Sequence, residues 1–326
     1  MFTPPDDIDP DDVRVAVRDG WRFDAVALEY QAVGFGSHHW LATGGDGSRR
    51  FVTVDVLGAK RGGFDGLNRA LDSAYRLRHE AGLPFVIAAE LAGDGSALRH
   101  VGDAHAVAVY EIVDGTSLAS GPFPSNELRE SVLRLVAAMH AATPAVIDVA
   151  DRDDFGVAAR DGLERALEEL DREWDGGPYA DPTRGLLAEH ATAVRRGLAT
   201  YDRLVRTVMA SDAPWVITHG EPHAQNVMIT DDGPVLIDWD TALIGPPERD
   251  LWMLTSDGDD LGLDAYSEIA GHRPNRDAVM LYRLWWALCE VAGYTAEFRR
   301  PHRDTEDSRV AWDNLCDHIA LVERWG

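Results

Sequence analysis

The hydrophobic pattern of the first third of the chain predicts a small antiparallel sheet. Apolar and polar residues alternate in AVALEYQAVG (25–34) and FVTVDVL (51–57), which is the period of a half-buried strand, and the strand-like run HHWLAT (38–43) lies between them. Two further strand-like runs follow, FVIAAEL (85–91) and HAVAVYEI (105–112), with a Gly/Asp-rich turn between them. Because turn residues separate these runs, we expect neighbouring strands to pair as an antiparallel meander.

Two helices are predicted around these strands. Asp9 is a good N-cap residue, a proline and two acidic residues follow it, and Gly20 ends the segment. In residues 64–82, apolar side chains recur at helical spacing and Gly82 provides a C-terminal stop. The expected order in this region is therefore helix, three strands, helix and at least two more strands.

Beyond residue 113 the pattern changes to that of amphipathic helices. The sequence DGTS (114–117) is typical of a linker, so we place a boundary there between a β-rich lobe, 1–113, and a helical lobe, 114–326. Helical spacing of apolar residues predicts the main helices of the second lobe at 125–142, 183–209, 277–299 and 308–325, and the segment 151–175 is predicted to contain a further amphipathic helix. The predicted fold class is α+β with two lobes.

Length and charge limit the kinds of protein that this chain can be. The 326 residues are enough for two lobes, and 31 basic against 56 acidic residues give a formal charge of −25. This charge repels polyphosphate backbones, so we expect no nucleic-acid partner, and it attracts small cationic molecules instead. The acid excess also has an ordinary explanation, because it keeps a protein surface hydrated.

The sequence pattern offers no membrane span and no cysteine chemistry. No apolar run approaches the roughly twenty residues of a membrane span, and the first residues lack the basic start and apolar middle of a signal peptide. We therefore expect a cytoplasmic protein without a membrane partner. Cys289 and Cys316 lie in separate helical segments without C-x-x-C spacing, and we expect them to be buried packing residues.

One stretch, WVITHGEPHAQNVMITDDGPVLIDWD (215–240), concentrates residues of catalytic type. Two strand-like runs flank a polar loop that contains Glu221 and Asn226, and Asp238 follows the second run. The carboxylate of Glu221 is a candidate base for a substrate hydroxyl, while Asn226 and Asp238 offer the oxygen ligands that Mg²⁺ prefers. Such a set of side chains suits phosphoryl transfer.

Two zinc-based interpretations of the H-G-E-P-H segment fail. Two histidines four residues apart around a glutamate resemble a zinc-binding helix, but Gly220 and Pro222 prevent a regular helix there. The H-x-E of a zinc deaminase requires a later P-C-x-x-C, which the chain does not contain.

The segments ITHGEPHAQNVMI (217–229) and LIDWDTALIGPPERDL (236–251) resemble the catalytic and metal-binding segments of the aminoglycoside phosphotransferase family. The fold of that family is similar to that of eukaryotic protein kinases. Within the family, the motif looks most like those of spectinomycin and related aminocyclitol kinases. The resemblance implies a small nucleotide-binding β lobe at 1–113, a larger, mainly helical catalytic lobe at 114–326, and ATP and Mg²⁺ as cofactors.

The same resemblance assigns roles to individual residues. Glu221 stands where the family usually has its catalytic aspartate, and Asn226 and Asp238 match the Mg²⁺ ligands. His219 and Asp250 match positions that support the loop and the following helix. Glutamate in place of aspartate is a departure, since the extra methylene moves the carboxylate by about one bond length and misplacement of that size costs up to about 100-fold in rate.

Two small-lobe segments are candidates for nucleotide binding. The turn at Gly34, Gly36 and Ser37 lies where a glycine-rich loop would cover the ATP phosphates, although glycines are also common in ordinary hairpin turns. At the junction of the lobes, the resemblance implies that the backbone from Glu111 to Val113 contacts adenine.

The lysine of the kinase pattern is missing from its usual strand. FVTVDVL offers Thr53 and Asp55 instead, and Lys60, the chain's sole lysine, comes just after that strand. Lys60 is the candidate for contacting the phosphates from a different backbone position. The following helix carries Arg69, Arg76 and Arg78, so we further hypothesise that Asp55 pairs with one of these arginines.

The acceptor site is predicted from an acidic loop and one tryptophan. Asp257 and Asp260 follow the metal-binding region closely and are candidates for binding ammonium groups, with a solvated loop as the alternative. Trp285 is a candidate for stacking on a sugar or cation, with core packing as the alternative.

The function predicted from these residues is an ATP- and Mg²⁺-dependent small-molecule O-phosphotransferase. Its favoured acceptor is a hydroxyl of a cationic antibiotic such as an aminoglycoside or aminocyclitol, which would give antibiotic resistance. A kinase of a choline-, homoserine- or sugar-type metabolite is the first alternative. A non-catalytic nucleotide-binding protein is the second, because of the missing strand lysine and the altered base.

Overall fold

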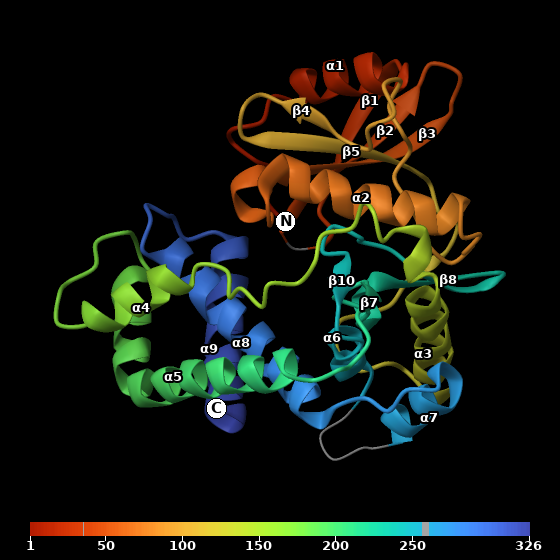
Figure 1. Cartoon of the computed structure of the whole chain (residues 1–326). Coiled ribbons are helices and arrows are strands. Elements are labelled where there is room, and N and C mark those ends of the chain that lie inside the picture. The colour runs from red at the N-terminus through yellow and green to blue at the C-terminus, as the bar shows by residue number, and fades with distance from the viewer. Residues whose placement is uncertain (35, 256–260) are drawn as a thin grey trace. The chain divides into compact units, whose positions relative to one another are not determined.

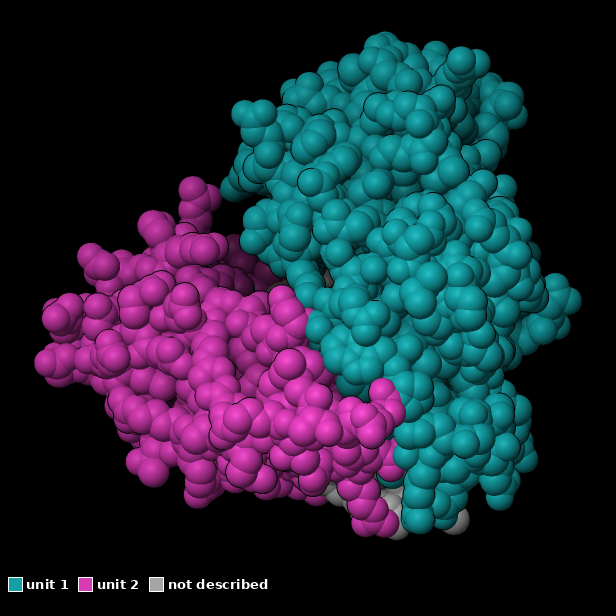
Figure 2. Space-filling model, viewed as in Figure 1, with its two compact units in different colours: residues 1–153, 214–273 teal, residues 154–213, 274–326 magenta. Residues whose placement is uncertain are grey.

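A computed structural model describes residues 1–34, 36–255 and 261–326. The chain forms two compact units, the first made of residues 1–153 and 214–273 and the second of residues 154–213 and 274–326. Figure 2 colours these units separately. The residues directly before and after position 113 both belong to the first unit, so the division into units does not test the lobe boundary predicted there, which stays a prediction.

The first unit contains a five-stranded antiparallel sheet with the order β1-β2-β3-β5-β4 (Figure 1). Its strands are β1 (Ala25–Gln31), β2 (Ser37–Gly44), β3 (Arg49–Val56), β4 (Arg99–Val101) and β5 (His105–Glu111). The strand-like runs of the sequence therefore predict the first three strands and β5 correctly. Their meander arises because short turns connect β1 to β2 and β2 to β3.

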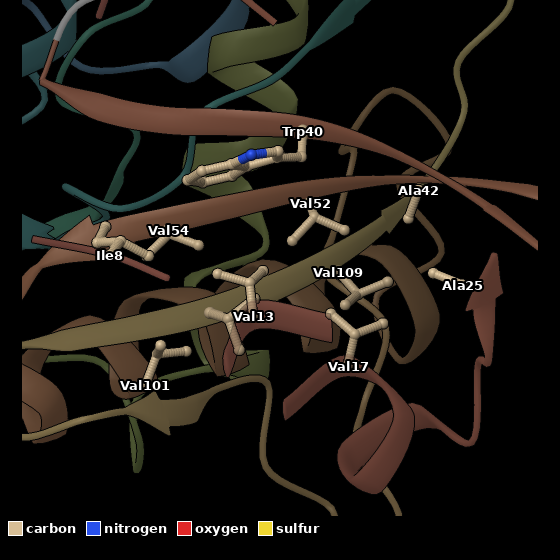
Figure 3. Packing of buried hydrophobic residues seen from close by; sticks show 11 residues of the cluster. Ile8, Val13, Val17, Ala25, Trp40, Ala42, Val52, Val54, Val101 and Val109 are labelled. Carbon is tan, nitrogen blue, oxygen red and sulfur yellow. The ribbon is translucent and has the colours of Figure 1, made fainter. Parts of the chain in front are cut away.

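The two faces of this sheet have different roles. Successive strand residues point to opposite faces, so Trp40, Val52 and Val54 share one side and pack against Val13 and Val17 of the first helix (Figure 3). This helix, α1 (Pro10–Trp21), begins as predicted, with the Asp9 side chain accepting a hydrogen bond from the Asp11 backbone. The opposite face carries Ser37, His39, Thr53 and Asp55 in register on β2 and β3.

Residues 85–91 do not form the predicted strand. The segment makes a single bridge at Val86, and its backbone exchanges hydrogen bonds with Leu236: Ile87 N donates to Leu236 O at 3.0 Å and Leu236 N donates to Phe85 O at 2.7 Å. The apolar pattern thus belongs to an irregular segment whose backbone pairs with Leu236, a residue far along the chain. Helix α2 (Gly63–His79) lies where predicted but ends before Gly82, whose φ is +70°.

The rest of the first unit carries two small sheets and short helices. The first sheet has the order β6-β8-β9 and the second pairs β7 with β10. Their strands are β6 (Thr116–Ser117), β7 (Val216–Thr218), β8 (Val227–Thr230), β9 (Gly233–Leu236) and β10 (Leu243–Gly245). The helices are α3 (Asn126–Ala141), α6 (Glu248–Leu251) and α7 (Leu261–Ala270). The predicted linker thus contributes a short strand, β6, which pairs with β8.

The second unit is helical. It contains α5 (Ala180–Met209), α8 (Arg276–Phe298) and α9 (Glu306–Trp325), close to the predicted bounds, and α4 (Arg160–Glu168), which lies within the segment 151–175 where one helix was predicted. Cys289 and Cys316 are half-buried and form no disulfide, so the expectation of full burial is wrong. Within the described residues, no helix has the length and apolar character needed to cross a membrane.

Candidate active site

The polar loop between β7 and β8 is held by a buried carboxylate. The backbone N–H groups of His219 and Gly220 donate to Oδ2 and Oδ1 of Asp250 at 3.0 and 2.6 Å, and Asp250 is completely buried on α6. Burial opposes ionisation, but the hydrogen bond and charge of His140 lower the pKa of Asp250 below its ordinary value. Asp250 therefore acts as an anionic anchor for the loop backbone, the role that the resemblance implies.

His219 is fixed in one tautomer. Its Nδ1 accepts a hydrogen bond from the Glu221 backbone at 3.2 Å, so Nε2 carries the proton and donates to Ile237 O at 2.9 Å. Burial lowers the pKa of His219, which keeps the ring neutral at ordinary pH. His219 thus ties the loop to the chain segment that follows β9.

Gly220 is required by its surroundings. Its φ is +98°, and a Cβ atom at this position would lie 2.4 Å from Nη1 of Arg249. Arg249 is buried, and its guanidinium donates to Thr218 Oγ1 at 2.9 Å and to Thr241 O at 3.0 Å. The glycine of H-G-E therefore allows a buried arginine to support the loop from below.

Glu221, the predicted base, has a half-buried side chain in this loop. Its Oε2 lies 3.8 Å from Nε2 of His223, and its carbonyl oxygen accepts a hydrogen bond from Nδ2 of Asn226 at 3.0 Å. Because the amide nitrogen makes this hydrogen bond, the amide oxygen of Asn226 faces away from the Glu221 carbonyl. Its role as a metal ligand stays a prediction.

The β8–β9 hairpin brings the two predicted metal ligands to the same end. Val227 pairs with Leu236, and the Ile237 backbone donates to Asn226 O at 3.0 Å, so Asn226 and Asp238 flank the open end of the hairpin. Asp238 has a φ of +66°, a conformation that is uncommon for a non-glycine residue but one that aspartate adopts more readily than most.

Asp238 and Asp240 form a crowded acidic pair. Although Asp238 is exposed, the surrounding protein atoms and then the neighbouring Asp240 carboxylate raise the pKa of Asp238 above its usual range. The pKa of Asp240 is lowered: desolvation opposes this, but the charge and hydrogen bond of Lys60 outweigh it. A divalent cation would relieve the repulsion between these carboxylates.

Lys60 lies among carboxylates of the sheet and of this segment. Its Nζ is 2.5 Å from Asp240 Oδ2, 2.9 Å from Asp55 Oδ1 and 3.3 Å from Ser37 Oγ. Desolvation disfavours the charged form, but Asp240 and then Asp55 raise the pKa of Lys60 well above its ordinary value. The structure thus brings Lys60 together with Asp240, a residue of the same motif to which the sequence pattern assigned no role.

The hypothesis that Asp55 pairs with a helix arginine is wrong. Asp55 contacts Lys60 and accepts a hydrogen bond from Ser37 Oγ at 2.5 Å. The α2 arginines have other partners: Arg69 binds Asp151, Arg76 binds Asp72 and Asp148, and Arg78 donates to Pro84 O. Asp55 is buried on the sheet, so the nearby ammonium group of Lys60 reaches it more easily than a helix arginine does.

The remaining nucleotide candidates lie on the sheet. Gly34 and Gly36 have φ values of +68° and +96° in the turn between β1 and β2, and Ser37 begins β2 next to Lys60. Glu111 ends β5 as an exposed residue, and the chain leaves the sheet through Val113. Their contacts with a nucleotide stay predictions.

The acceptor candidates are only partly described. Asp257 and Asp260 lie outside the described residues. Trp285 is half-buried in the second unit, where Nε1 donates to Gly156 O at 2.8 Å and the ring meets Tyr282 edge-on with centroids 6.3 Å apart. A role for Trp285 toward an acceptor therefore stays a prediction.

Two further residues of the loop support were missed from the sequence. His140 on α3 places Nε2 at 2.9 Å from Asp250 Oδ2 and Nδ1 at 2.7 Å from the hydroxyl of Tyr266 on α7, and all three side chains are buried. No local motif signals this network, because its members come from three separate helices. It joins α3 and α7 to the backbone of the catalytic loop.

The donor set fits a metal that also takes oxygens from a ligand. In the described part of the chain, no group of three or more His, Cys, Asp or Glu side chains is arranged to hold a metal ion alone. Asn226 and Asp238 supply one amide and one carboxylate oxygen. Mg²⁺ is characteristically bound in this way, through few protein ligands, several waters and substrate phosphates.

A family model described as the phosphotransferase enzyme family matches residues 33–282, most of the chain and all of the loop described above. The chain belongs to this family. The predicted enzyme class, a small-molecule kinase, is therefore confirmed.

Individual relatives of this phosphotransferase are distant. Protein StrN of Streptomyces griseus is 28% identical over 255 residues, which cover 74% of each chain. The spectinomycin phosphotransferase solved with ADP and spectinomycin has a TM-score of 0.72, 13% identity and coverage of 97% of this chain and 98% of that one. An amicoumacin kinase solved with AMP-PNP, Ca²⁺ and its antibiotic has a TM-score of 0.63, 13% identity and coverage of 97% and 93%. These similarities confirm the predicted α+β, kinase-like fold.

Proposed function

We propose that this phosphotransferase transfers the γ-phosphoryl group of ATP, with Mg²⁺, to a hydroxyl of a small cationic molecule. The observation that carries the proposal is the contact of the Lys60 ammonium with Asp240, two residues after Asp238, at the end of the hairpin that Asn226 and Asp238 flank and next to the loop that holds Glu221. A base, two oxygen ligands for a metal and one cation for phosphates are the parts that phosphoryl transfer requires.

Nucleotide and metal have separate contacts in this proposal. Lys60 and the turn at Gly34–Ser37 bind the phosphates, and the backbone from Glu111 to Val113 binds adenine. The Asn226 amide oxygen and Asp238 hold Mg²⁺, which when bound neutralises phosphate charge. The ADP and AMP-PNP complexes of the two structural neighbours, one of them with Ca²⁺, support the use of a nucleotide and a divalent metal.

Glu221 accepts the proton of the acceptor hydroxyl. Its carboxylate is half-buried and its backbone is fixed at both the N–H and the C=O, so the longer side chain starts from a rigid position. His223 lies next to the carboxylate and limits where it points. A rigid loop and a neighbouring side chain fix where the carboxylate lies, and this compensates for the extra methylene of glutamate.

The favoured acceptor is an aminocyclitol or aminoglycoside antibiotic. The net charge of −25 attracts cations, and Asp257, Asp260 and Trp285 are the proposed contacts. The spectinomycin complex of a structural neighbour supports this class. A metabolite of choline, homoserine or sugar type is the alternative acceptor.

One experiment tests both the activity and the base. The protein is incubated with ATP, Mg²⁺ and a panel of aminocyclitols, aminoglycosides and small alcohols, and products are sought by mass spectrometry as a gain of one phosphoryl group. Glu221→Gln should abolish turnover and leave ATP affinity nearly intact.

The panel also separates the alternatives. Phosphorylation of the metabolites alone would replace the antibiotic proposal with the metabolite one. ATP binding without any product across the panel would count against catalysis and favour a nucleotide-binding protein. Unchanged turnover of Glu221→Gln would remove Glu221 from the role of base.

A further inference from the structure

Three arginines on or just before α2 contact one short acidic segment, residues 148–153. We call these contacts the α2 anchor, which consists of Arg61 with Asp153, Arg69 with Asp151, and Arg76 with Asp148. All six residues belong to the first unit. The helix is therefore tied by charge to a part of the chain that follows α3.

The pair of Arg69 and Asp151 has the best geometry of the three. Nε donates to Oδ1 at 2.8 Å and Nη2 donates to Oδ2 at 2.9 Å, so the two planar groups form two parallel hydrogen bonds. Such bidentate pairs hold a direction as well as a distance. Arg76 also reaches both oxygens of Asp148, at 3.2 Å, but Asp148 is exposed.

The acidic segment is joined to the strands that carry the catalytic loop. Ile244 N donates to Asp151 O at 2.7 Å, and Asp153 N donates to Ile244 O at 2.8 Å. Ile244 lies on β10 and pairs with Ile217 of β7, and β7 leads directly into the loop at His219. One end of the anchor is thus part of the catalytic framework.

The other end of the anchor, α2, is joined to Lys60 by a backbone hydrogen bond. Gly63, the first residue of α2, donates its backbone N–H to Lys60 O at 3.0 Å, and Lys60 N donates to Leu57 O at 3.2 Å. Lys60 therefore sits in a tight turn attached to the helix. A shift of α2 moves the lysine backbone with it and changes the reach of Nζ toward Asp240.

We propose that the α2 anchor positions Lys60 for the phosphates of the nucleotide, with Arg69 and Asp151 as its main positioning residues. The proposal rests on the phosphate-binding role given to Lys60 above. In this chain the arginines of the anchor bind the acidic segment 148–153, and through them the position of α2 sets the position of Lys60.

The test is a double-mutant cycle on nucleotide affinity. Binding of Mg²⁺·AMP-PNP is measured by calorimetry for the wild type, Lys60→Ala, Arg69→Gln, Asp151→Asn, and the double variant Lys60→Ala/Arg69→Gln. Arg160→Gln is the matched control, because Arg160 forms a comparable bidentate pair with Asp202, at 2.6 and 2.9 Å, in the second unit. Thermal unfolding of every variant measures the purely structural effect.

Lys60→Ala should weaken binding, and Arg69→Gln and Asp151→Asn should each weaken it about fivefold, the effect of a good partly exposed ion pair. Arg160→Gln should change the nucleotide affinity less than about twofold, although it should lower the unfolding temperature about as much as Arg69→Gln does. In the Lys60→Ala background, Arg69→Gln should have no further effect, since the anchor acts through the lysine.

Two other outcomes overturn different claims. Unchanged affinity of Lys60→Ala would refute the phosphate role of Lys60, and the anchor proposal with it. Weakened binding of Lys60→Ala, combined with equal affinities of Arg69→Gln and Arg160→Gln, would leave the lysine role standing and refute the anchor alone.

Discussion

Replacement of Gly220 by alanine is the sharpest test of how the catalytic loop is supported. The φ of +98° alone costs an alanine about 1–2 kcal/mol. The new Cβ would also meet three guanidinium atoms of Arg249 at 2.4–2.7 Å, so the guanidinium must move. Its hydrogen bonds to Thr218 and Thr241 are then lost, at about 1.5–3 kcal/mol each. We expect a total loss of about 4 kcal/mol or more in the free energy of unfolding.

Gly47→Ala provides the matched control. Gly47 has a similar φ of +83°, but a Cβ there meets no atom within 4 Å, so only the backbone cost of about 1–2 kcal/mol applies. Urea unfolding followed by tryptophan fluorescence gives both values. In an Arg249→Ala background the cost of Gly220→Ala should fall to that of the control. Equal losses for the two glycine variants in the wild-type background would refute the contact with Arg249.

Three further predictions concern the site and its supports. His140→Ala should lower the free energy of unfolding by about 1.5–3 kcal/mol, because the buried Asp250 carboxylate loses one of its hydrogen-bond partners. Denaturant titration measures this loss, and a value below about 1 kcal/mol would contradict the prediction. Asp238→Ala should remove the Mg²⁺ dependence of AMP-PNP binding in calorimetry, whereas retained dependence would take Asp238 out of the metal site. Burial lowers the pKa of His39 to about 4, so the unfolded state takes up a proton before the folded state does. The free energy of unfolding should therefore fall, by at most about 3 kcal/mol, as the pH drops from about 6.5 to 4. His39→Gln should reduce this pH dependence in unfolding experiments, and an unchanged pH dependence would show that other groups cause it.

Local signals were enough to predict much of the fold. The N-cap at Asp9 and the alternation in β1 to β3 depend only on neighbouring residues, and these elements lie where the sequence places them. The segment at 85–91 has the same apolar character, but its hydrogen-bond partner is Leu236, far along the chain. No local pattern distinguishes a strand from a single buried bridge, so this prediction was wrong.

The candidate site divides in the same way. Glu221, Asn226 and Asp238 lie in one contiguous motif, and this made them visible in the sequence. The contacts of Lys60 with Asp240 and of Asp250 with His140 join distant segments, and charge alone does not select such partners. The arginines of α2 illustrate the limit, since several carboxylates were available to them and the fold decided which they bind.

The position of the chain's sole lysine has a practical consequence for labelling. Amine-reactive reagents require a neutral, accessible amine, and the Lys60 ammonium is only 14% exposed and paired with two carboxylates. Its ε-amine should therefore react slowly, and its acylation rate becomes a single-site reporter of whether Asp55 and Asp240 still enclose it. In a protein with many lysines, acylation of the other side chains would obscure this reaction. Here, peptide mapping of the acylated Lys60 reports directly on the site.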